Sequence, residues 1–198
     1  MITVAGAGPG HPRLLTEEVR EKIISTPRVL SFGRISDTLH ELREDIEPVG
    51  KVSELLHHLD GEETLILASG DPLFYGVVAY LKRQGIPIDA IYPGISSFQY
   101  LMAKLQLPWQ DAQLFSVHGR VAPLDELKSK GVAVFLTDEE HNPAWLNKEF
   151  HRRGARGRLY VGTRLSYEDE EIKSYDIGEE VDDVDPLTVV VIDYDMVK

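Results

Sequence analysis

The sequence predicts a protein of two α/β domains. Two observations carry this prediction: short apolar runs typical of buried strands alternate with helix signals, and the chain breaks near Pro108 before a new strand begins. We place an N-terminal domain at residues 1–110 and a C-terminal domain at 111–198, because the two parts have similar lengths and each carries its own strands.

In the first half, strand and helix signals alternate, which predicts a mostly parallel sheet. Thr16 followed by Glu17 and Glu18 has the pattern of an N-cap and an acidic first turn, so a helix is expected from there to about Ile24. Gly85 is expected to end a later helix. The expected strands are 2–5, 28–32, 64–68 and 88–92, and the other helices are 36–42, 53–59, 76–84 and one ending near 107–108.

The second half is expected to be rich in strands. An acidic stretch, residues 168–185, is interpreted as a solvated surface that includes a short strand. The expected strands are 112–117, 133–137, 158–162, 171–175 and 187–193.

Composition excludes several classes of function. A net charge of −12 disfavours nucleic acid as a partner, since the surface as a whole would repel a phosphate backbone. The absence of cysteine excludes disulfides, thiolate metal sites and a cysteine nucleophile, and the histidines do not have the spacing of metal ligands, so we expect no metal site. No apolar run approaches the roughly 18 residues of a membrane-spanning helix, and no charged leader precedes the first strand. We therefore expect a cytoplasmic protein that does not enter a membrane.

Two loops rich in glycine and proline, residues 5–12 and 68–76, each follow an expected strand. Ligands bind at the carboxyl ends of strands in open α/β sheets, so the loops predict a small-molecule site. A dinucleotide site fits poorly. Pro9 removes a backbone donor, the third glycine of the first loop comes one residue early, and residues 32–34 lack the acid expected to bind a ribose.

Taken in order, the loops at residues 6–10, 69–76 and 93–97 resemble those of the tetrapyrrole (corrin/porphyrin) methylase family. The resemblance covers the whole chain. The residues His118-Gly119-Arg120, which follow Leu107-Pro108-Trp109, resemble the branch of that family that methylates C5 of a corrin precursor.

This resemblance implies two α/β domains with S-adenosylmethionine in the cleft between them, in a homodimer. It also implies methylation of C5 of cobalt-precorrin-7 or precorrin-7 in cobalamin biosynthesis. Methylation at C15 and decarboxylation would then belong to a separate protein, because 198 residues leave no room for a second methyltransferase domain. The residues that match the family's cofactor site are Pro9, Gly70, Asp71, Phe74, Ser96, Ser97, Leu136, Thr137, Leu187 and Thr188.

Methyl transfer from a sulfonium requires alignment and exclusion of water rather than a nucleophilic side chain. His118 is the candidate base for the hydrogen that leaves the methylated carbon, although a structural histidine at a strand end is an equal alternative. Asp71, the second candidate catalytic residue, would orient the cofactor, accept a hydrogen bond or cap a helix.

A tetrapyrrole precursor carries many carboxylates, so the acidic protein needs local basic groups to bind it. The candidates are Arg120 above all, Arg13 and Arg34, and further Lys104 and Arg164, each of which is otherwise a solvated surface residue.

Two alternative functions stay open. One is a methyltransferase of the same family that acts on another corrin position or on a protein, as diphthine synthase does. The other is a non-catalytic module that binds S-adenosylmethionine.

Overall fold

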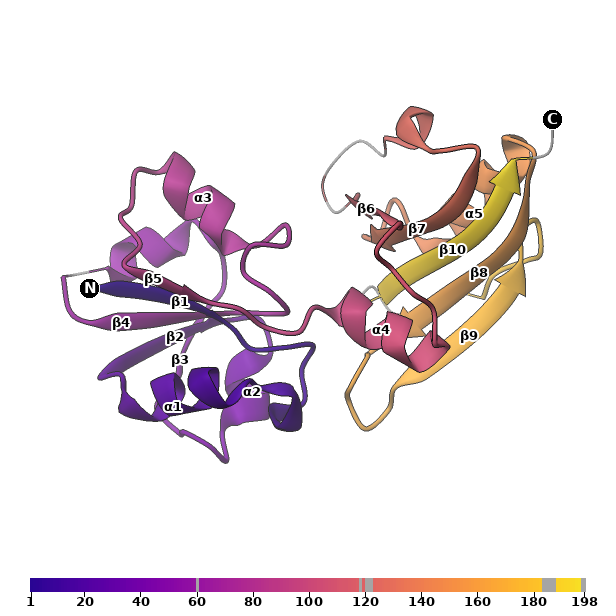
Figure 1. Ribbon diagram of the computed structural model, residues 1–198. Helices are drawn as coiled ribbons and strands as arrows, with labels where there is room; N and C mark the ends of the chain where they lie inside the picture. Colours follow the sequence, from indigo (N-terminus) through magenta and orange to yellow (C-terminus); the bar gives the residue numbers. More distant parts are fainter. Residues whose placement is uncertain (60, 118, 120–122, 183–187, 197–198) are drawn as a thin grey trace. The chain divides into compact units, whose positions relative to one another are not determined.

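A computed structural model describes the chain except for residues 60, 118, 120–122, 183–187 and 197–198. The chain forms two compact units, Met1–Ser97 and Phe98–Lys198 (Figure 1). The division falls after Ser97, the first residue of helix α4 (Ser97–Leu105), and so lies earlier than the expected boundary at residue 110. Contacts within the second unit explain why α4 belongs to it: the Leu101 methyl groups lie against Gly162, and Lys104 Nζ lies 3.0 Å from a carboxylate oxygen of Glu170.

The first unit is built on a five-stranded sheet in the order β3-β2-β4-β1-β5, in which every pair of strands is parallel. The parallel sheet expected for this half is therefore confirmed. The order makes β4, β1 and β5 neighbours, so the loops at their carboxyl ends emerge side by side. The strands are β1 (Ile2–Gly6), β2 (Arg28–Phe32), β3 (Glu47–Val49), β4 (Thr64–Ala68) and β5 (Ala90–Tyr92), of which only the short β3 was not expected.

Helices cover both faces of this sheet: α1 (Glu17–Ser25) and α2 (Ile35–Leu39) lie on one face and α3 (Val77–Arg83) on the other (Figure 1). The Thr16 hydroxyl accepts a hydrogen bond from the Val19 amide at 3.3 Å, which confirms the expected N-cap of α1. α2 is shorter than the expected helix 36–42, and the expected helix 53–59 is the 3₁₀ turn η2 (Glu54–His58). A second 3₁₀ turn is η1 (Pro12–Leu14).

The second unit is built on a mixed sheet in the order β6-β7-β10-β8-β9. β6 and β7 are parallel, whereas β10 runs antiparallel to both of its neighbours and β9 antiparallel to β8. The strands are β6 (Gln113–Ser116), β7 (Lys130–Leu136), β8 (Ala155–Thr163), β9 (Glu171–Asp176) and β10 (Thr188–Met196). β9 lies in the acidic stretch, where a short strand was expected.

Helix α5 (Pro143–Arg152) connects β7 to β8 and was not expected from the sequence, and a 3₁₀ turn, η3 (Leu124–Glu126), lies between β6 and β7. The Asn142 side chain caps α5 by accepting a hydrogen bond from the Trp145 amide at 2.9 Å. Phe150 of α5 packs edge to face on Phe135 of β7 in the core of this unit, with ring centroids 5.9 Å apart.

Among the residues that the structure describes, no helix combines the length and the apolar character needed to cross a bilayer.

Candidate functional site

The loops that follow β1 and β4 pair with each other beyond the ends of their strands. The Ala7 amide donates to the Ala68 carbonyl and the Gly70 amide donates to the Gly8 carbonyl, both at 2.8 Å. Gly8 and Gly70 thereby form an isolated antiparallel bridge. The two loops singled out in the sequence are therefore joined directly.

Gly6, Gly70 and Gly94 bring the β1, β4 and β5 loops together so closely that Gly6 and Gly94 have no room for side chains. A Cβ atom on Gly6 would lie 2.6 Å from the Gly94 Cα, and one on Gly94 would lie 2.7 Å from the Gly6 Cα. Both added atoms would also meet the Gly70 carbonyl oxygen. Gly70 itself has a φ of +66°, which glycine adopts without strain. The three loops therefore pack backbone against backbone at this edge of the sheet.

Asp71 connects the β4 loop to the β5 loop through its side chain. One carboxylate oxygen accepts a hydrogen bond from the Leu73 amide at 2.8 Å, and the other accepts one from the Gly94 amide at 3.3 Å. Of the roles considered from the sequence, the described contacts of Asp71 correspond to accepting hydrogen bonds from the main chain. Asp71 holds the loops in place.

The remaining cofactor candidates of the first unit lie in the same three loops. Pro9 and Ser96 are buried, while Phe74 and Ser97 are partly exposed. Gly70 lies against Ser96, since a Cβ atom on Gly70 would be 3.5 Å from the Ser96 Cα. The β4 and β5 loops are therefore in contact at Gly70 and Ser96.

Two exposed apolar side chains in the β4 loop were not identified from the sequence. Leu73 and Tyr75 are 61% and 42% exposed, and they flank Phe74, whose ring meets that of Tyr75 with centroids 5.0 Å apart. Tyr75 has a φ of 53°, which is uncommon for a residue with a side chain. Apolar residues between a proline and a glycine in a loop were the signal that could have identified this surface, which suits an apolar ligand.

In the second unit, the structure brings Leu136, Thr137 and Thr188 together. Leu136 ends β7, and the buried Thr137 hydroxyl donates a hydrogen bond of 2.9 Å to the Thr188 carbonyl at the start of β10. Leu187 lies outside the described residues.

His118 and Arg120 also lie outside the described residues, but Gly119 between them is described. Gly119 has a φ of +62°, and its amide donates a hydrogen bond of 2.8 Å to one carboxylate oxygen of Asp138. The other oxygen of Asp138 accepts a hydrogen bond of 2.6 Å from the His141 amide. These two amides, that of His141 most strongly, lower the pKa of Asp138 because they stabilise its charged form. Asp138 was not identified from the sequence, although an aspartate soon after a strand was the available signal.

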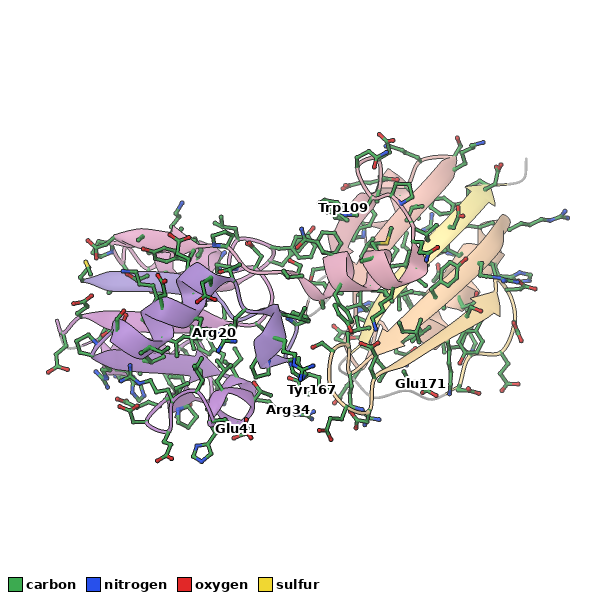
Figure 2. The ribbon with its side chains drawn as sticks, turned by 60° about the horizontal axis from the view of Figure 1, so that its bottom comes forward. Arg20, Arg34, Glu41, Trp109, Tyr167 and Glu171 are labelled. Carbon is green, nitrogen blue, oxygen red and sulfur yellow. The ribbon has the colours of Figure 1, made fainter. Side chains whose placement is uncertain are left out.

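The basic candidates fall into two groups. Arg13 in η1 and Arg34 at the start of α2 (Figure 2) have exposed side chains and follow strands of the first sheet. Lys104 and Arg164 instead lie 3.0 Å from carboxylate oxygens of Glu170 and Asp169. Hydrogen bonds to Tyr100 and Glu170 raise the pKa of Lys104. Lys104 and Arg164 are therefore paired with acids of this chain, whereas Arg13 and Arg34 stay the candidates of the first unit for binding substrate carboxylates.

Comparison with known proteins identifies the family of this chain. The sequence pattern of the family described as Tetrapyrrole (Corrin/Porphyrin) Methylases matches residues 1–179. The chain belongs to this family. It is 31% identical to "Cobalt-precorrin-7 C(5)-methyltransferase" of Salmonella typhimurium over 202 aligned positions, which cover 98% of this chain and 99% of the relative. It is 29% identical to "Probable cobalt-precorrin-7 C(5)-methyltransferase" of Methanocaldococcus jannaschii, again over 98% and 99% of the two chains.

Solved structures of the family share the fold. The uroporphyrin-III C-methyl transferase of Thermus thermophilus, solved in complex with S-adenosyl homocysteine, matches with a TM-score of 0.76 and 24% identity, over 97% of this chain and 91% of that one. The fold of two α/β domains expected from the sequence is thereby confirmed.

Proposed function

We propose that this chain transfers a methyl group from S-adenosylmethionine to C5 of cobalt-precorrin-7, or of its cobalt-free counterpart, in cobalamin biosynthesis. The observation that carries the proposal is the match to two proteins named for this reaction over nearly the whole of each chain. The alignment therefore includes both units of this chain.

The cofactor that we propose, S-adenosylmethionine, supplies a methyl group already activated by its sulfonium. The loops at the edge of the first sheet support this proposal: Gly6 and Gly94 let the loops pack closely against each other, and Leu73 and Tyr75 offer an exposed apolar surface on the β4 loop. The complex of the Thermus relative with S-adenosyl homocysteine, which is the cofactor without its methyl group, supports the same conclusion. The residues that we propose to hold it are Pro9, Gly70, Phe74, Ser96 and Ser97 of the first unit and Leu136, Thr137, Leu187 and Thr188 of the second.

The chain's own residues have three tasks in this proposal. Asp71 fixes the loops through its bonds to the Leu73 and Gly94 amides, so it acts on the cofactor by way of the backbone. His118 accepts the proton that leaves the methylated carbon. The guanidinium groups of Arg13, Arg34 and Arg120 bind substrate carboxylates and offset, locally, the net charge of −12.

We also propose that the protein works as a cytoplasmic homodimer and that a separate protein methylates C15. The Salmonella relative, whose name mentions C5 alone, matches this chain end to end, which supports the second point. Analytical ultracentrifugation of the purified chain tests the first: a monomer at micromolar concentration would contradict it.

The decisive experiment for the reaction is a single incubation of the purified protein with a chemically defined precorrin-7 or cobalt-precorrin-7 and S-adenosylmethionine labelled with ¹³C in its methyl group. We expect the product mass to increase by one methyl group and the ¹³C resonance to report attachment at C5. A label on another carbon would support the alternative of a different corrin position. Binding of the cofactor without any methylated tetrapyrrole would contradict the proposal and favour a non-catalytic binding module or a protein acceptor.

His118→Ala tests the proposed base. We expect this variant to bind S-adenosylhomocysteine as the wild type does, measured by calorimetry, and to turn over about 100-fold more slowly, because general base catalysis contributes factors of about 10²–10⁴. Turnover equal to that of the wild type would remove His118 from the mechanism.

A further inference from the structure

Asp138 in the second unit repeats the bonding pattern of Asp71 in the first. Each aspartate follows closely on the carboxyl end of a strand, Asp71 after β4 and Asp138 after β7. One oxygen of each accepts from an amide of its own turn: Leu73 at 2.8 Å for Asp71 and His141 at 2.6 Å for Asp138. The other oxygen of each reaches a different loop.

The second bond ends in both cases on the amide of a glycine that follows another strand of the same sheet, β5 for Gly94 and β6 for Gly119. Asp71 accepts from Gly94 at 3.3 Å, 23 residues away in sequence, and Asp138 accepts from Gly119 at 2.8 Å, 19 residues away. A turn by itself needs only the first bond. The second bond therefore has the separate effect of tying two loops to each other.

The side chain of Asp138 is itself held in place by helix α5 and the turn before it. The Nδ1 atom of His141 lies 3.4 Å from an oxygen of Asp138, and the His141 ring meets the Trp145 ring edge to face at 4.7 Å between centroids. The side chains of Asp138 and His141 are 17% and 18% exposed, so water competes weakly for the carboxylate. Contacts thus run without a gap from Trp145 through His141 and Asp138 to the backbone of Gly119.

We propose that Asp138 is a positioning residue for the methyl acceptor: it fixes the backbone of Gly119, the residue bonded to His118 and Arg120, whereas Asp71 fixes the loops for the cofactor. This inference rests on the proposed function, since it assigns the acceptor side of that reaction. Gly119 has a φ of +62°, so the bond to Asp138 holds it in a conformation that it would otherwise exchange for others. The bond thus fixes the backbone conformation of Gly119 itself.

The test compares Asp138→Asn with two other variants of the full chain, Glu139→Gln and Asp71→Asn. Each of the three substitutions removes one negative charge. An asparagine keeps one acceptor oxygen and replaces the other by an NH₂ group that donates, so it cannot accept from both amides. Glu139→Gln is the matched control, because Glu139 is the exposed neighbour of Asp138. Asp71→Asn is the comparison in which the affinity for S-adenosylhomocysteine is expected to change. For each variant we would measure KM and kcat for the tetrapyrrole, and the Kd of S-adenosylhomocysteine by calorimetry.

We expect Asp138→Asn to raise the KM for the tetrapyrrole about tenfold and to leave the Kd of S-adenosylhomocysteine within about twofold, as expected when one hydrogen bond to a charged group is lost. Asp71→Asn is expected to raise that Kd about tenfold. Glu139→Gln is expected to change neither quantity. An unchanged KM in Asp138→Asn, or equal losses for both ligands, would overturn the inference.

A measurement without substrate separates this inference from the proposed function. Hydrogen exchange of the Gly119 amide, followed by NMR, is expected to be slow in the wild type and at least tenfold faster in Asp138→Asn. An unprotected Gly119 amide in the wild type would refute the role of Asp138 even if the variant does not fold. If the Gly119 amide is protected in the wild type but the wild type methylates no tetrapyrrole, the proposed reaction is wrong. The hydrogen bond between Asp138 and Gly119 is then still supported.

Discussion

Replacing Gly94 by alanine tests whether the three loops must meet as closely as they do. The added Cβ atom would lie 2.7 Å from the carbonyl carbon and the Cα of Gly6 and would also meet the Gly70 carbonyl oxygen. Carbon atoms pack best at about 3.5–4.0 Å, so the loops would have to separate by roughly 1 Å. Overpacking typically costs about 1–3 kcal/mol, and we expect the upper end because every clashing atom belongs to the backbone.

Thermal unfolding and calorimetry measure the two consequences. A loss of about 3 kcal/mol lowers the Tm of a unit of this size by roughly 12 °C or more. We expect the Kd of S-adenosylhomocysteine to rise at least about tenfold in Gly94→Ala, because the separated loops no longer present the same backbone.

Gly50→Ala is the matched control for this substitution. Its added Cβ atom would meet only the tip of the Glu54 side chain, at 3.1 Å, and that side chain can move aside. We expect its Tm and its affinity for S-adenosylhomocysteine to stay close to those of the wild type. Cofactor affinity in Gly94→Ala equal to that in Gly50→Ala would refute the reasoning that the close approach of these loops forms the site.

Three further predictions concern stability. Asn142→Ala removes the cap of α5 and should lower the free energy of unfolding by about 1 kcal/mol, measured in urea. Thr137→Val removes the donor to the buried Thr188 carbonyl and should cost about 1–3 kcal/mol in the same assay, whereas no loss would mean that the hydrogen bond contributes nothing. The hydrogen bond from Arg28 lowers the pKa of Glu47, so the stability that this pair contributes is present above the usual pKa of a glutamate and is lost as the pH falls through the lowered value. Glu47→Gln should therefore lower the Tm at pH 7 and should lose this effect once the pH is below the lowered pKa of Glu47.

Sequence patterns predicted the first unit well because its strands are apolar runs bounded by glycine and proline. Residues 28–32 and 64–68 form strands with the expected bounds, and Thr16 and Gly85 flank helices as expected. β3 was not predicted because it is three residues long and contains a proline, a residue that strands usually exclude.

The second unit was harder to predict because its organisation depends on pairing between distant segments. Helix α5 carried its signals in Asn142 and Pro143, the cap and first turn, and in Leu146 and Phe150 one turn apart on the buried face. The apolar runs of the strands on either side are a stronger pattern than these signals. The order of strands in the mixed sheet leaves no local pattern at all, since β10 is paired with β7 and β8 by contacts far along the chain.

The candidate site likewise has residues that the sequence predicted and residues that it did not. The three loops could be recognised from their glycines and prolines, and Asp71 from its place between Gly70 and Pro72. The bond from Asp138 to Gly119 could not, because it joins residues 19 positions apart through a main-chain amide, which any residue except proline could have offered. The ion pairs of Lys104 and Arg164 were likewise invisible, since their partners are two of the many acids in residues 168–185.

The place of β10 in its sheet has a consequence for the order of folding during synthesis. β10 follows the other strands of the second sheet in sequence but pairs in the middle, with Val189 opposite Leu136 and Gly162. Until β10 leaves the ribosome, β7 and β8 each expose an unpaired edge, and exposed edges are where chains associate wrongly. The first sheet, in contrast, has all its strands once Tyr92 has emerged. We therefore expect the first unit to fold before synthesis is complete, whereas the second unit can fold only after its central strand β10 has been made. A nascent chain stalled before Thr188 is then expected to need protection by chaperones.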